Sequence, residues 1–166
     1  MVAKETGETY PGHLSTGEIP VHIARAKAEA VRGDVGKDRI ILAADTVVVV
    51  DEQIIGKPKD PADAVRMLSL LSGRQHRVIT GVAVVQGEQE QSFSEMTEVC
   101  FHPLTGEQIR FYVEKYRPFD KAGAYAIQEW IGVIGIKSIR GDFYNVMGLP
   151  VSRVVQVLKQ FWTGIK

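Results

Sequence analysis

The sequence has little cysteine and no long apolar run. Cys100 is the single cysteine among 166 residues, so an internal disulfide is excluded and a reducing compartment is acceptable. Nowhere do about 18 apolar residues follow one another, which excludes an ordinary membrane-spanning helix. The N-terminal stretch is polar throughout and is unlike a secretory signal. These absences predict a soluble cytoplasmic protein with no membrane partner.

The chain also has no net charge at pH 7. Twenty basic residues balance twenty acidic ones, and no run of lysine or arginine stands out. Because binding to a phosphate backbone relies on clustered positive charge, a nucleic acid partner is not expected. The hydrophobic share of 45% and the charged share of 24% are ordinary for globular proteins, and the length suits one domain over residues 1–166.

Several familiar catalytic patterns are also missing. There is no glycine-rich Walker loop, no Gly-x-Ser-x-Gly elbow and no paired cysteine and histidine, which argues against P-loop chemistry and acyl transfer. The four histidines lack the spacing of zinc ligands. They are His13, His22, His76 and His102.

What is present is an alternation of helical and extended patterns. Apolar spacing and cap residues predict helices from Pro20 to Val31, from Asp60-Pro61 to a stop at Gly73, from Thr105 to about Tyr116, and from Pro150 to about Trp162. Extended patterns predict strands at Ile40 to Val50, Gln53 to Ile55, Val78 to Val85, Phe93 to Phe101 and Val133 to Ile139.

The strand Ile40 to Val50 is almost continuously apolar, as expected for a central strand covered on both faces. The polar turn Gln86-Gly87-Glu88 predicts a long hairpin between the third and fourth strands. A turn is expected near Gly141-Asp142. The predicted class is α/β or α+β with a mixed, curved sheet.

Asp45 is the anomaly, because it lies in the middle of this apolar strand. An isolated buried carboxylate costs several kcal/mol, so Asp45 must be paired, bind a metal ion or face a cleft. We favour a functional carboxylate. The alternative is that Asp45 and Thr46 satisfy backbone groups at a bulge or a strand end.

Three further segments are candidates for ligand binding. Lys57 lies in the turn Gly56-Lys57-Pro58 and suits a phosphate, although such turns are commonly only solvated, as is the helical Lys27. Small and polar residues at 120–128 predict a ligand wall. The segment 141–150 leads into the last helix and is either a second wall or an ordinary turn.

Several short motifs follow one another along the chain. They are Glu8-Thr9-Tyr10-Pro11, Ala44-Asp45-Thr46-Val47-Val48, Gly56-Lys57-Pro58, Leu71-Ser72-Gly73-Arg74 with His76, Thr80-Gly81-Val82, Asp120-Lys121-Ala122-Gly123-Ala124-Tyr125 with Gln128, and Asn145-Val146-Met147-Gly148-Leu149-Pro150. Together they resemble the Maf family of septum-formation proteins over nearly the whole chain.

The resemblance implies a fold and an activity. The fold would be an inosine-triphosphatase-like α/β architecture, with an elongated mixed sheet flanked by helices and two lobes around a cleft. The activity would be hydrolysis of a nucleoside triphosphate to the monophosphate and pyrophosphate with a divalent cation, Mg²⁺ or Mn²⁺. Homodimers are frequent in the family, so a second copy is an expected partner.

Roles carried over by position place Asp45 and Glu8 as catalytic carboxylates at the metal or the attacking water, with Gln128 contacting substrate or water. Lys27 and Lys57 would hold phosphates, and the neighbouring Thr46 would help to shape the nucleotide site.

The stretch 120–128 is similar to the branch of the family that acts on dTTP and UTP. Modified pyrimidine nucleotides are further candidate substrates.

The family's opening strand and its Ser-x-Ser-Pro-Arg-Arg-like turn have no counterpart before Glu8. The alternative function is therefore a shortened or inactive Maf-like protein that binds nucleotides or takes part in cell division.

Overall fold

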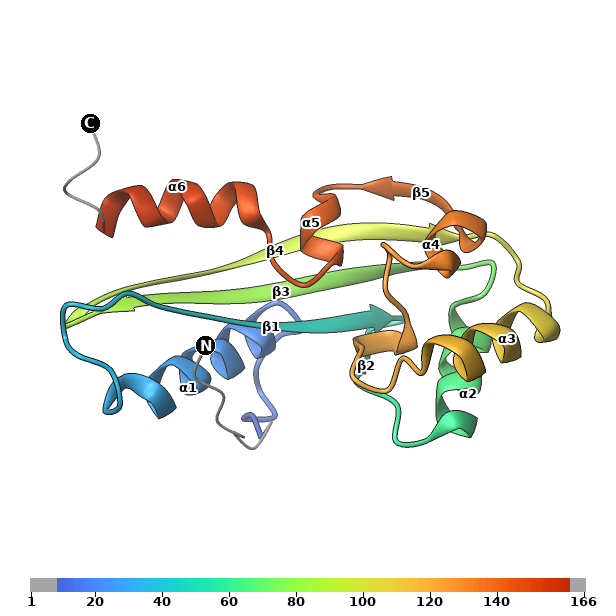
Figure 1. Cartoon of the computed structure of the whole chain (residues 1–166), viewed down its shortest axis with the longest axis horizontal. Coiled ribbons are helices and arrows are strands. Elements are labelled where there is room, and N and C mark those ends of the chain that lie inside the picture. Colours follow the sequence, from blue (N-terminus) through green and yellow to red (C-terminus); the bar gives the residue numbers. More distant parts are fainter. Residues whose placement is uncertain (1–8, 162–166) are drawn as a thin grey trace.

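A computed structural model describes residues 9–161 and shows a long five-stranded sheet with helices on both faces (Figure 1). The strands are β1 (Ile41–Val50), β2 (Gln53–Ile55), β3 (Gln75–Gln86), β4 (Gln89–Phe101) and β5 (Ile136–Arg140), in the spatial order β2-β1-β3-β4-β5. The 13 residues of β4 span about 40 Å, so the sheet is elongated as expected.

Every strand pairing within residues 9–161 is antiparallel, so the expected mixture of parallel and antiparallel pairs is wrong for this part of the chain. The reason is the short β2, which turns back along β1 before the helical crossover starts. The crossover therefore leaves from a reversed strand and places β3 antiparallel to β1 on its other side. The hairpin of β3 and β4 is confirmed, and only Gly87 and Glu88 separate its strands.

Six helices and a short 3-10 turn complete the described residues: α1 (Glu18–Arg32), α2 (Pro61–Leu71), α3 (Gly106–Tyr116), η1 (Ala122–Ala124), α4 (Trp130–Gly135), α5 (Phe143–Val146) and α6 (Val151–Phe161). The predicted caps are present. The Asp60 side chain accepts from the Asp63 amide, and Thr105 and Gln108 form a reciprocal capping box. No helix within residues 9–161 is long and apolar enough to cross a membrane.

Two parts of the chain differ from the predicted elements. The strand expected at Val133 to Ile139 is shifted: residues 133–135 are the end of helix α4 (Trp130–Gly135), and the strand β5 covers Ile136–Arg140. A short apolar run has no periodicity that separates buried helix from buried strand. The turn expected near Gly141-Asp142 continues directly into the helical turn α5, which Asp142 caps through the Tyr144 amide.

The apolar core is divided along the sheet. A large cluster at one end joins α2 and α3 to Val48, Val78 and Phe101. At the other end, α1 packs on Ala83 on one face of the sheet, and α6 packs on Val82 on the opposite face (Figure 1). The molecule thus has two apolar lobes connected by the long strands, as the resemblance implied.

Candidate functional site

The site lies where β1 leaves one lobe and enters the other. Within residues 9–161, Val48 to Val50 pair with β2, while the preceding half of β1 pairs only with β3. Burial follows a similar division: the expected cover on both faces is complete only for Val47 to Val50. Asp45 and Thr46 lie in the half-covered part, at an edge of the sheet.

Asp45 and Thr46 point to opposite faces of the sheet. Asp45 pairs with Gly81, and α1 approaches this glycine so closely that a Cβ there would lie 2.1 Å from the Val21 amide nitrogen. Paired residues in an antiparallel ladder share a face, so Asp45 faces α1. Thr46 faces the other way and its hydroxyl lies 2.9 Å from that of Thr80.

Lys27 of α1 neutralises the partly buried carboxylate of Asp45. Its Nζ lies 2.5 Å from Asp45 Oδ1, and the side chain of Asp45 is 9% exposed while that of Lys27 is 29% exposed. A nearly enclosed carboxylate requires such a partner because desolvation is otherwise too costly. Of the three situations that the sequence allowed for Asp45, which were pairing, metal binding and a position at a cleft, this geometry shows the pairing.

A cavity of about 290 Å³ opens beside this ion pair. Its lining brings together all the predicted site residues that the structure describes, namely Lys27, Asp45, Thr46, Lys57 and Gln128. The remaining predicted residue, Glu8, lies outside residues 9–161. Both segments proposed as ligand walls contribute as well, through residues 120–122, 125, 126 and 146–148.

A second hollow of about 240 Å³ lies on the α1 side and includes Tyr10, Ile23 and Val47. It shares Asp45, Thr46 and Lys57 with the first cavity. The edge of β1 is thus open on both faces of the sheet at the carboxylate.

A further ion pair lies at the wall formed by residues 120–128. Lys121 Nζ lies 2.7 Å from Asp120 Oδ2. The hydrogen bond from Lys121 lowers the pKa of the Asp120 carboxyl below its ordinary value, and the positive charge of Lys57 adds to this effect. Three lysines and two aspartates line the cavity, so its ionisable lining has one excess positive charge and suits an anion.

The loop that carries Gln128 is held from behind by Tyr112. This buried hydroxyl accepts from the Ala126 amide at 3.1 Å and donates to the Glu129 carboxylate. The pKa of Tyr112 is raised, first by burial and then by the hydrogen bond to Glu129, so the phenol stays protonated. Gly132 closes the loop, because a Cβ there would lie 1.7 Å from the Ile127 carbonyl oxygen.

This support by Tyr112 was not predicted from the sequence. Tyr112 fits the helical pattern of residues 105–116, and nothing local indicates that its hydroxyl reaches a loop 14 residues further along the chain. The glycine at 132 was the available signal, since glycine in an apolar run often marks a close backbone approach.

The cavity contains some of the ligands that a divalent cation requires. Among residues 9–161, no three His, Cys, Asp or Glu side chains gather closely enough to hold a metal by themselves. Asp45 and Asp120 supply two carboxylates to the cavity lining. Magnesium commonly uses one or two carboxylates together with substrate phosphates and water, so these residues fit a metal that arrives with a nucleotide.

Comparison with known proteins agrees with the motifs. The model of the family described as Maf-like protein matches residues 1–161. A protein of Cytophaga hutchinsonii named dTTP/UTP pyrophosphatase is 49% identical over 159 residues, covering 96% of this chain and 72% of that protein. Proteins of the same name from Parabacteroides distasonis and Porphyromonas gingivalis are 46% and 48% identical, covering 96% and 95% of this chain and 83% and 80% of theirs. The chain therefore belongs to the family of Maf-like proteins.

Proposed function

We propose that the protein hydrolyses dTTP and UTP to the nucleoside monophosphate and pyrophosphate. The relatives that match nearly all of this chain carry the name dTTP/UTP pyrophosphatase. The observation that carries the proposal is the enclosed Asp45 carboxylate, paired with Lys27 in a cavity that Lys57 and Gln128 also line.

The reaction replaces one bond at the α-phosphorus with another. A water oxygen bonds to this phosphorus, the bond to the pyrophosphate oxygen breaks in line with it, and the water gives up a proton. Asp45 orients the water and accepts its proton. Lys27 and Lys57 neutralise charge on the phosphates and the leaving pyrophosphate, while Gln128 hydrogen-bonds the substrate or the water.

A divalent cation, Mg²⁺ or Mn²⁺, belongs to this proposal. Asp45 would hold it together with Glu8 and the substrate phosphates, with Asp120 as a further carboxylate of the lining. The bound ion would supply charge neutralisation and activation of water. One excess positive charge in the lining is too little for a triphosphate, which is the physical reason to expect the ion.

We propose the remaining features on the resemblance to the Maf-like family. Thr46 and the wall of residues 120–128 shape the site for a pyrimidine nucleotide, including modified pyrimidines. The chain acts as a single catalytic domain in the cytoplasm, and a second copy is its expected partner.

The test is pyrophosphate release from UTP or dTTP with Mg²⁺. Asp45→Asn keeps the shape of the side chain but removes its charge and basicity, so we expect the rate to fall by about a hundredfold or more. Asp38→Asn changes an exposed carboxylate in a loop away from the cavity and is the matched control.

Circular dichroism and thermal unfolding of both variants show whether they are folded. Full activity of folded Asp45→Asn would contradict the proposed chemistry. Nucleotide binding by the wild type without any pyrophosphate release, measured by calorimetry, would indicate the binding protein that the sequence leaves as the alternative.

A further inference from the structure

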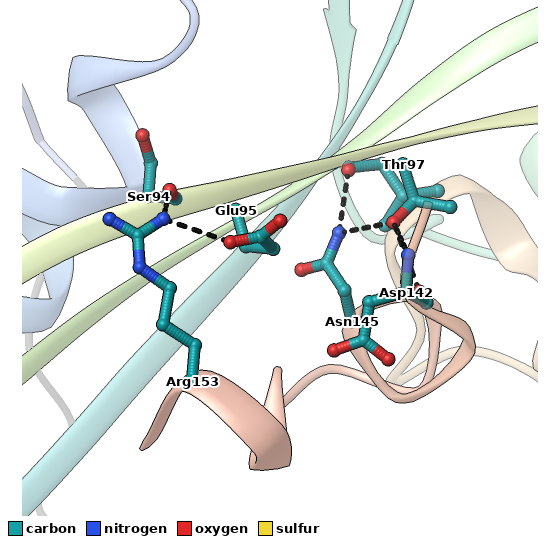
Figure 2. A network of polar contacts seen from close by, with 7 residues as sticks. Ser94, Glu95, Thr97, Asp142, Asn145 and Arg153 are labelled. Atoms are coloured by element: carbon teal, nitrogen blue, oxygen red, sulfur yellow. Dashed lines mark hydrogen bonds and ion pairs between the residues drawn. The ribbon is translucent and has the colours of Figure 1, made fainter. Parts of the chain in front are cut away.

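One wall of the cavity is a short stretch of chain held at both of its ends. The last residue of α5 and the two residues that follow it line the cavity, and we call residues 146–148 the 146–148 wall. Figure 2 shows polar contacts that attach both flanking helices to β4, through Asn145 on one side and Arg153 on the other.

The attachment at Asn145 is buried. This side chain is fully enclosed, and its Nδ2 donates to the Val78 carbonyl oxygen at 3.1 Å and to Thr97 Oγ1 at 3.0 Å. Thr97 Oγ1 in turn donates to the Asp142 carbonyl oxygen at 3.0 Å and accepts from the Asp142 amide at 3.1 Å (Figure 2). One threonine hydroxyl thus contacts both Asp142, which caps the N-terminus of α5, and Asn145 within this helical turn.

The same network reaches the catalytic strand. Thr80 Oγ1 donates to the Asn145 carbonyl oxygen at 3.2 Å, which leaves Thr46 as the donor in its 2.9 Å contact with Thr80. The Thr46 hydroxyl also lies 3.5 Å from the Gly148 carbonyl oxygen. Hydrogen bonds in such a chain strengthen one another when water is excluded, and Thr80, Thr97 and Asn145 are all buried.

The attachment at Arg153 is different in kind. Its Nη1 donates to the Ser94 carbonyl oxygen at 2.8 Å and contacts Glu95 at 2.9 Å (Figure 2). The guanidinium also lies over the ring of Phe93. The side chains of Arg153 and Glu95 are 47% and 30% exposed. Exposed ion pairs contribute little because solvent screens them, so the buried attachment is the one that holds the wall.

We propose that Asn145 and Thr97, which do not line the cavity, are positioning residues that hold the 146–148 wall in place and so determine which nucleotide the cavity accepts. This inference rests on the proposed function. Two bases of similar shape are distinguished by hydrogen-bonding groups kept in register with them, and a displacement of about 1 Å is enough to lose that discrimination. The wall presents backbone groups and the side chains of Val146 and Met147 to the cavity, and the attachment at Asn145 and Thr97 holds the turn that carries them.

The test compares Thr97→Val with Thr97→Ser. Valine keeps the shape and removes the hydroxyl, whereas serine keeps the hydroxyl. For Thr97→Val we expect KM for UTP to rise about five- to tenfold, with kcat changed less than about twofold, because the cost of losing a buried hydrogen bond falls on binding. The preference for UTP over CTP in kcat/KM should fall by a similar factor, and Thr97→Ser should retain the wild-type values.

Amide hydrogen exchange provides a readout that needs no activity. The amides of residues 147–149 donate to carbonyl oxygens of residues 143–145, so loosening α5 should speed their exchange in Thr97→Val and leave them slow in Thr97→Ser. Arg153→Gln is the control for the outer attachment and should change neither exchange nor KM. Slow exchange and unchanged UTP preference in folded Thr97→Val would overturn the inference, whereas an inactive wild type would overturn the proposed function instead.

Discussion

At the scale of single residues, His76 shows how the fold changes the chemistry of a side chain. The ring is buried between Phe101 and Tyr125, both of which meet it edge-on. Its Nε2 lies 2.7 Å from the Tyr125 hydroxyl, while Nδ1 has no partner within the described structure. Burial lowers the pKa of His76 from 6.5 to about 4, so the imidazole is neutral behind the cavity wall to which Tyr125 belongs.

This pKa shift predicts a pH dependence of stability. Unfolded His76 takes up a proton below about pH 6.5, whereas the folded residue does so only near pH 4. Acidification through this window therefore favours unfolding. The free energy of unfolding contains a contribution of about 3 kcal/mol from His76, which is fully present above pH 6.5 and is lost as the pH falls to about 4. Urea denaturation from pH 4 to 8 should show a shallower loss of stability for His76→Gln than for the wild type.

His102→Gln is the control for this measurement, since His102 is exposed. Its stability should follow the wild-type pH curve. If the free energy of unfolding falls equally steeply with acidification in His76→Gln and in the wild type, the buried ring does not cause the loss of stability at low pH.

At the scale of elements, the contact between α1 and β3 sets the distance between Lys27 and Asp45. Gly81 has no side chain to separate the two elements, and the backbone of Pro20 and Val21 occupies the place where its Cβ would be. This is a requirement for space in a strand interior, where glycine is otherwise unfavourable. The helix can therefore lie close enough for Lys27 to reach the carboxylate on the neighbouring strand.

Gly81→Ala should separate these elements. A Cβ 2.1 Å from the Val21 amide nitrogen forces α1 away from the sheet, at a cost of about 2–4 kcal/mol in the free energy of unfolding. Pyrophosphate release should fall as well, because Lys27 moves with α1. Denaturant titration and the activity assay measure the two effects.

The matched substitution is Gly33→Ala at the end of the same helix. Nothing lies within 4 Å of a Cβ there, and the backbone φ of −73° suits alanine. We expect a change of less than about 0.5 kcal/mol for this exposed position. A similar small effect of Gly81→Ala would mean that α1 does not depend on the close approach.

At the scale of the whole molecule, the site lies between two lobes that share the long strands of the sheet. Lys27 comes from α1 in one lobe. Gln128 comes from the loop before α4, and Ile131 of α4 belongs to the large apolar cluster of the other lobe. Asp45 lies between them on β1. A ligand that contacts all three therefore joins the lobes and should stabilise the molecule as a whole.

A UTP analogue with a non-hydrolysable link between the α- and β-phosphates tests this coupling. At a hundred times its dissociation constant, a ligand that binds only the folded state adds about 2.7 kcal/mol to the free energy of unfolding. We expect a matching rise in the melting temperature with Mg²⁺. Lys57→Ala should reduce the rise at the same ligand concentration, because one phosphate contact is lost.

Exposed Lys159→Ala in α6 is the control and should show the full rise. Absence of any shift in the wild type across millimolar analogue would contradict a nucleotide site between the lobes.

Much of this architecture could be predicted from local patterns. The Asp60-Pro61 cap, the Thr105 cap and the turn at Gly87 are signals contained within a few neighbouring residues, and all three mark real boundaries. The apolar run from Trp130 has no such signal, and its division into α4 and β5 depends on which surfaces it covers.

The sequence by itself determined the caps, the hairpin and the presence of a carboxylate inside an apolar strand, because each depends on residues close together in the chain. Only the tertiary structure decided the all-antiparallel order of the described strands, the meeting of Lys27 with Asp45, and the attachment of Asn145 to Thr97. These contacts join residues 18 and 48 positions apart. Their formation depends on which elements pack side by side, which no local pattern in the chain specifies.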